Sequence, residues 1–282
     1  MGNCITVIEN VRRPDPEYGS IKFEEAEQLI KPFDVLLFKG GDFISDGIRK
    51  IEKATSKVGA FSHAALVISP KYIDFRVALA EYIPAKEGPE RTHFLDVIKE
   101  LEANPDKLYT WEITMSGNLN DGVTDAFGKS FLGVQIRSFD EVMLAVRNNP
   151  KVRVAWLQLK PHEEARKLEA IKEIEVPDIT IEIDTNFEEK KRKATILFQQ
   201  TYEAPYEACF CILMAASCPS LRCCSTKGTT RFFCSEFVAY ILKEMGFLAS
   251  SCHEEKVVPV DFIPSVDVDR EINCCVEPKY LL

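Results

Sequence analysis

The chain has 282 residues, of which 46% are hydrophobic and 28% are charged, a composition typical of a globular protein with a sizeable core. Its formal net charge is −9, and no basic stripe offsets that charge. Because binding to nucleic-acid phosphates needs a basic face, the sequence argues against a nucleic-acid partner.

The first six residues match the pattern M-G-x-x-x-[ST] for N-myristoylation of Gly2. Cys4 is placed for palmitoylation, and two acyl chains anchor a protein stably where one binds only marginally. Polar residues follow the first few positions too closely for the hydrophobic region of a secretory signal. The longest apolar stretch, 208–218, is too short to span a bilayer. We therefore expect lipidation at Gly2 and Cys4, and a cytoplasmic protein held at a membrane surface.

Residues 1–20 read as an irregular arm, and residues 21–282 as one domain. Apolar runs and alternating segments predict strands at 34–39, 61–68, 77–83, 108–114, 133–137 and 152–159. Helical spacing and capping signals predict helices at 23–30, 43–53, 138–147, 185–200 and 232–244. This pattern predicts an α+β fold in which a small antiparallel sheet packs with helices.

Ten cysteines without a signal peptide indicate free thiols in a reducing compartment. Paired C-x-x-C units at zinc spacing are absent from the sequence, so we expect no metal site. Cys234 has a distinctive setting, because it begins the predicted helix Cys234–Leu242. The unpaired N–H groups at a helix N-terminus favour a thiolate, which is the nucleophilic form of cysteine. The alternative for Cys234 is a small buried hydrophobic residue.

His63 stands at the start of the apolar strand 61–68, whereas His93, His162 and His253 lie in polar surroundings. A histidine on a rigid strand can serve as the base for a thiol, although a lone histidine of this kind is commonly structural. Such a pair needs a third group that orients the imidazole. Glu112 in the strand 108–114 is one candidate and Glu81 is the other, and either could instead point outward to solvent.

Taken together, these segments resemble the circularly permuted NlpC/P60 branch of the papain-like hydrolases, which includes YiiX-like bacterial proteins and a poxviral group. The resemblance rests on the order of the strand 34–38, Ser62-His63, a carboxylate strand, Gly133–Ile136, Pro205-Tyr206-Glu207 and Phe233–Val238. It covers about half of the chain and leaves 69–107 and 138–195 as insertions. In that family the histidine precedes the cysteine along the chain.

The resemblance implies that Cys234 is the nucleophile, His63 the general base and a glutamate the third residue. It favours Glu112 over Glu81, because Gly133–Ile136 follows Glu112 as it does in the family. Tyr206 matches a tyrosine whose hydroxyl would help to bind an oxyanion, although Glu207 stands where the family has Asp. A more distant lecithin:retinol acyltransferase-like branch carries Asn before the cysteine and a second histidine near the first. This chain has Phe233 there and lacks that histidine.

The predicted activity is therefore cleavage of an amide bond through a thioester, without a metal or organic cofactor. Two alternatives stay open at this point. One is an acyl hydrolase or acyltransferase that acts on lipids, which the expected membrane attachment favours. The other is a catalytically inactive binding module tethered to the membrane. The expected partners are accordingly a peptide or acyl-lipid substrate and the membrane surface.

Gly2→Ala replaces the glycine that the myristoylation pattern requires at this position, so we expect it to abolish incorporation of a myristate analogue. The measurement is metabolic labelling of the full chain in cells, with Cys4→Ala as the comparison because that change leaves the myristoylation pattern intact. Label that persists on the Gly2→Ala chain, or that is absent from the unaltered chain, would contradict the lipidation.

Overall fold

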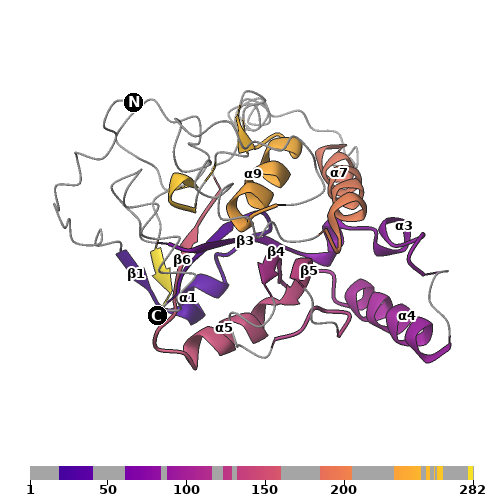
Figure 1. Cartoon of the computed structure of the whole chain (residues 1–282), viewed down its shortest axis with the longest axis horizontal. Coiled ribbons are helices and arrows are strands. Elements are labelled where there is room, and N and C mark those ends of the chain that lie inside the picture. The colour runs from indigo at the N-terminus through magenta and orange to yellow at the C-terminus, as the bar shows by residue number, and fades with distance from the viewer. Residues whose placement is uncertain are drawn as a thin grey trace, which may run out of the picture.

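The fold is described from a computed structural model, which covers residues 19–40, 61–83, 88–115, 123–128, 132–159, 185–204, 232–248, 252–254, 257, 259–262 and 279–281. These residues form an α+β structure in which helices cover both faces of one sheet (Figure 1). The predicted fold class, an antiparallel sheet packed with helices, is confirmed at this level.

The sheet has seven strands in the order β1-β7-β6-β2-β3-β4-β5. Five of them, from β6 to β5, are antiparallel to their neighbours; β7 pairs antiparallel with β6, and β1 pairs parallel with β7. The strands are β1 (Gly19–Ile21), β2 (Val35–Lys39), β3 (His63–Ile68), β4 (Tyr109–Met115), β5 (Leu132–Ser138), β6 (Arg153–Leu157) and β7 (Lys279–Leu281).

Side chains on β2 and β3 alternate between two hydrophobic clusters, as the twofold repeat of a strand requires. Leu37 and Leu66 belong to the larger cluster, which also takes buried residues from α4 (Gly88–Ala103), α7 (Thr185–Thr201) and α9 (Cys234–Glu244). Leu36 and Ala65 belong to the smaller one, which takes residues from α1 (Phe23–Glu27) and α5 (Phe139–Arg147). Figure 1 shows α9 on one side of the sheet and α1 with α5 on the other.

Most of the predicted elements that fall on described residues are found, but the strand predicted at 77–83 is wrong. The chain there forms the short helix α3 (Phe75–Ala78) followed by turns. The reason is a capping interaction: the Asp74 carboxylate accepts a hydrogen bond from the backbone N–H of Val77 at 3.1 Å, which stabilises a helical start. The 3-10 helices η1 (Pro70–Tyr72) and η4 (Pro259–Phe262), as well as α4, were not predicted. The predicted helix at 43–53 lies outside the described residues.

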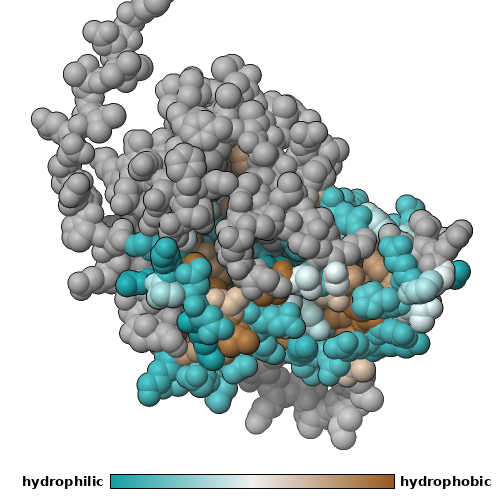
Figure 2. Space-filling view, turned by 60° about the horizontal axis from the view of Figure 1, so that its bottom comes forward, coloured by the Kyte–Doolittle hydropathy of each residue, from teal (hydrophilic) through white to brown (hydrophobic). Residues whose placement is uncertain are grey.

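The described surface carries large hydrophobic side chains on separate elements, among them Leu29, Val77, Leu144 and Ile196. On the face seen in Figure 2, hydrophilic side chains interrupt the apolar areas. Single exposed apolar residues of this kind are normal for a globular protein.

A buried carboxylate at the start of β2 ties three parts of the chain together. Asp34 accepts hydrogen bonds from the Trp156 indole N–H at 2.8 Å, from the Leu159 backbone N–H at 2.9 Å and from the Lys31 backbone N–H at 2.9 Å. Burial raises the pKa of Asp34, while these three donors act in the opposite direction. The carboxylate thus joins β2 to the end of β6 and to the turn after α1.

Asp34→Ala leaves these donors without their acceptor in a buried place, so we expect the free energy of unfolding to fall by about 3 kcal/mol. Urea denaturation followed by fluorescence measures this change. The matched control is Asp106→Ala, because the Asp106 side chain is exposed and its ion pair with Lys71 contributes little; we expect a change under about 1 kcal/mol. Equal effects of the two substitutions would contradict the structural role of Asp34.

Candidate active site

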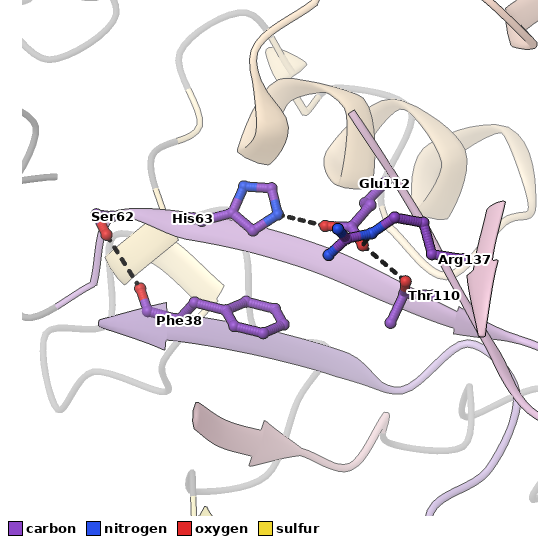
Figure 3. Close-up of polar contacts among 6 residues, drawn as sticks. All are labelled: Phe38, Ser62, His63, Thr110, Glu112 and Arg137. Carbon is purple, nitrogen blue, oxygen red and sulfur yellow. Dashed lines mark hydrogen bonds and ion pairs between the residues drawn. The ribbon is translucent and has the colours of Figure 1, made fainter. Parts of the chain in front are cut away.

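Strands β3 and β4 bring His63 and Glu112 together, although 48 residues separate them in the sequence. The register pairs Leu66 with Trp111, so Glu112 follows on β4 toward the beginning of β3, where His63 lies. His63 Nε2 and Glu112 Oε2 are 2.6 Å apart (Figure 3). This is the length of a strong, charge-assisted hydrogen bond.

The start of β3 is fixed by backbone and side-chain bonds around Ser62. Its hydroxyl donates to the Phe38 carbonyl at 3.3 Å and accepts from the Gly40 N–H at 3.2 Å. The Phe38 ring lies against the His63 imidazole, with 5.3 Å between ring centres. These contacts hold the imidazole on a rigid platform, as a general base requires.

Glu112 is completely buried, and its carboxylate contacts three charged or polar side chains. Its Oε1 accepts from the Thr110 hydroxyl at 2.6 Å and from Arg137 Nε at 3.0 Å, and its Oε2 faces His63. Burial alone would raise the pKa of Glu112, but the charge of Arg137, the bond and charge of His63 and the Thr110 hydroxyl together hold that pKa below its usual range. Glu112 is therefore an ionised carboxylate.

Cys234 is the first residue of α9, and its thiol is buried. The preceding residue, Phe233, has no side-chain acceptor to cap the helix. Instead the Glu236 carboxylate accepts from the Phe233 backbone N–H at 3.1 Å, and the Ser235 hydroxyl donates to the Val257 carbonyl at 2.7 Å. The first turn that carries the thiol is thus held from two sides.

Helix α9 packs against β3 and β4, and its Phe237 ring meets the edge of Trp111 with 5.6 Å between ring centres. This packing brings the Cys234 side chain to His63. Burial lowers the pKa of His63, but hydrogen bonds and charge from Cys234 and Glu112 outweigh that effect and raise the pKa to about 10. Since Nε2 faces Glu112, Nδ1 is the ring nitrogen that remains for the thiol.

The Glu112 carboxylate and the His63 imidazole differ in their exposure to solvent. The Glu112 side chain is sealed from solvent at 0%, whereas the His63 side chain is 14% exposed. A proton on the imidazole can therefore exchange with solvent or with a bound molecule, while the carboxylate behind it cannot be reached. The arrangement places a thiol beside an imidazole that can take up and release a proton.

Glu81, the rival carboxylate, is exposed in the turns after α3 and is not the residue that contacts His63. Tyr206, Gly2 and Cys4 lie outside the described residues. Sequence reasoning missed Thr110 and Arg137, the two donors to Glu112 Oε1. The available signal was an arginine inside the predicted strand 133–137, since a charged residue within a buried strand needs a partner.

The described residues contain no group of three or more His, Cys, Asp and Glu side chains arranged to hold a metal ion. Within the same residues, no helix has the length and apolar character needed to cross a bilayer. The two cysteines of the described part, Cys234 and Cys252, are both buried. No known family model matches the chain, and no curated protein matches it.

Glu112→Gln removes the negative charge beside the imidazole, so we expect the pKa of His63 to fall below the value of about 10 that it has in the intact site. An NMR titration of the imidazole signals measures it. Glu81→Gln is the matched control, because it makes the same chemical change at an exposed position. Equal His63 titrations in the two variants would show that Glu112 does not act on the imidazole.

The same pKa sets a dependence of stability on pH. The folded pKa of His63 is raised above that of an unfolded imidazole, about 6.5, so its contribution is complete below about pH 6.5 and is lost as pH rises through 10. Glu112→Gln should therefore flatten the decline in the free energy of unfolding over this interval, relative to Glu81→Gln.

Proposed function

We propose that the chain is a thiol hydrolase in which Cys234 is the nucleophile, His63 the general base and acid, and Glu112 the residue that orients the imidazole. One observation carries this proposal: the His63 imidazole is hydrogen-bonded to a buried carboxylate and also interacts with a thiol at the start of a helix. A thiol, a base within reach of it and a third group that orients the base are the recurring parts of nucleophilic catalysis.

In the proposed mechanism His63 takes the thiol proton, and the Cys234 sulfur attacks the carbonyl carbon of an amide. The imidazolium then gives its proton to the departing amine, which leaves a thioester on Cys234. His63 next removes a proton from water, whose oxygen attacks the thioester. The acid product departs, and the proton returns to the sulfur. Glu112 holds the ring so that Nδ1 faces the sulfur, and it stabilises the imidazolium in both halves of the cycle.

The position of Cys234 also supplies donors for the carbonyl oxygen. The first N–H groups of a helix have no partner within the helix, so they can stabilise the negative charge that develops on that oxygen. Tyr206, expected to assist there, remains a proposal because it lies outside the described residues.

The fold that we propose for this site is the permuted papain-like one, which accounts for the order of His63, Glu112 and Cys234 along the chain. An antiparallel sheet that carries the base and the carboxylate, with a helix that begins at the nucleophile packed against it, supports that assignment. We propose further that acylation at Gly2 and Cys4 holds the enzyme at a cytoplasmic membrane face. An amide is favoured over a lipid ester on the sequence resemblance.

The thiol of Cys234 should react with iodoacetamide at pH 6 to 7 at least about tenfold faster than that of Cys252, because the neighbouring His63 can take its proton. Peptide mapping by mass spectrometry gives the two rates in one sample, and both cysteines are buried, which makes them a matched pair. His63→Gln should remove most of the difference. Equal rates at Cys234 and Cys252 in the unaltered protein would contradict an activated thiol.

Once the thiol is shown to be activated, measurements of activity on peptide amides and on acyl lipids distinguish the two substrate classes. Cys234→Ala should abolish release of amine from peptide amides, whereas Cys252→Ala should leave it. Activity on acyl lipids in vesicles without activity on peptides would assign the site to lipids instead. A reactive thiol with neither activity would contradict both hydrolase assignments.

A further inference from the structure

Arg137 is a buried cation directly behind the proposed site. It lies on β5 across from Thr110 of β4, and only 2% of it is exposed. Its Nε donates to Glu112 Oε1 at 3.0 Å, whereas His63 binds the other oxygen of the same carboxylate (Figure 3). Burying an arginine is costly unless the charge is paired, so the position requires an explanation beyond packing.

The bonds to Glu112 are divided between its two oxygens. Thr110 and Arg137 both bind Oε1, and His63 binds Oε2. Two donors on Oε1 fix the rotation of the carboxylate, so Oε2 is held toward the imidazole. The carboxylate therefore has little freedom to turn away when His63 gains or loses a proton.

The charges form a row of three: the Arg137 guanidinium, the Glu112 carboxylate and the His63 imidazole. The carboxylate attracts a proton to the imidazole, while the guanidinium beyond it repels a second positive charge. Because the Coulomb energy falls only in inverse proportion to distance and is larger at buried sites than in water, this repulsion across one carboxylate is not negligible.

We propose that Arg137 is a positioning residue of this site: it holds Glu112 turned toward His63, and its positive charge limits how strongly His63 retains a proton. A base that kept its proton too firmly could not pass that proton to a leaving amine or accept one from water. The importance of this residue for catalysis rests on the proposed function, whereas its effect on the His63 proton does not.

Few other charged groups face the imidazole among the described residues. Glu112 of β4 and the Cys234 thiol of α9 contact it, β2 contributes the Phe38 ring, and Arg137 reaches it through Glu112. The buried side chains of α1 and α5 are apolar: Phe23, Ala26, Phe139, Val142 and Met143. Among these residues, a change in the proton affinity of His63 on substitution of Arg137 can therefore be attributed to Arg137 itself.

The test is an NMR titration of His63 in the full chain carrying Cys234→Ala, so that the thiol does not titrate with it. Arg137→Met keeps most of the side-chain volume and removes the charge, and we expect the proton affinity of His63 to rise about tenfold. The matched control is Thr110→Val, which removes the other donor to Oε1 but no charge; we expect a smaller change. An unchanged or lowered affinity in Arg137→Met would overturn the proposed effect of the Arg137 charge on the His63 proton.

Arg137→Met leaves Glu112 buried without its cation and could prevent folding, so a second pair of variants makes the same comparison with no buried carboxylate. Glu112→Gln alone retains the guanidinium near His63, while Glu112→Gln with Arg137→Met has neither charge. The double variant should fold at least as well, and its His63 should bind a proton more tightly than in Glu112→Gln. Equal affinities would overturn the proposal.

These titrations need no substrate and no thiol, so their failure is distinct from failure of the hydrolase assignment. The titrations can behave as expected while Cys234 proves no more reactive than Cys252. In that case the effect of Arg137 on the His63 proton is confirmed and the proposed hydrolase function is contradicted. In the chain that keeps Cys234, we compare how the rate of Cys234 alkylation depends on pH. Arg137→Lys should leave this dependence unchanged, because the charge is kept, whereas Arg137→Met should change it.

Discussion

The candidate site depends on one buried carboxylate, that of Glu112. A carboxylate sealed inside a protein is strongly unfavourable unless cations and hydrogen-bond donors surround it, and here Arg137, Thr110 and His63 supply them. These four residues come from β3, β4 and β5, so the charge is satisfied only when the three strands are in register. The same interactions that orient the imidazole therefore also specify how the strands pair.

The thiol enters this arrangement through helix packing rather than through the sheet. Phe237 of α9 meets Trp111 in the larger core, and the Glu236 carboxylate and the Ser235 hydroxyl hold the first turn of the helix. Apolar burial thus determines where Cys234 lies, and the polar contacts determine how its turn is oriented. The apolar core therefore provides stability, whereas the polar contacts of the first turn set the finer position of the Cys234 thiol.

Much of this was predictable from the sequence, because strands and helices leave strong periodic patterns. The apolar runs at 34–39 and 61–68 and the helix beginning at Cys234 follow directly from such patterns. The helix α3 was mistaken for a strand, since its apolar residues do not reveal that Asp74 caps a helical turn. Arg137 was missed for a different reason: its partner lies on a neighbouring strand, and a register cannot be read from one strand alone.

The order of the elements along the chain has a consequence for protein synthesis. His63 and Glu112 are translated well before Cys234, and α9 must then return to strands that were made much earlier. Closing so long a loop is slow compared with pairing neighbouring strands. A chain still emerging from the ribosome can therefore form the imidazole–carboxylate pair while the Cys234 thiol is not yet beside it.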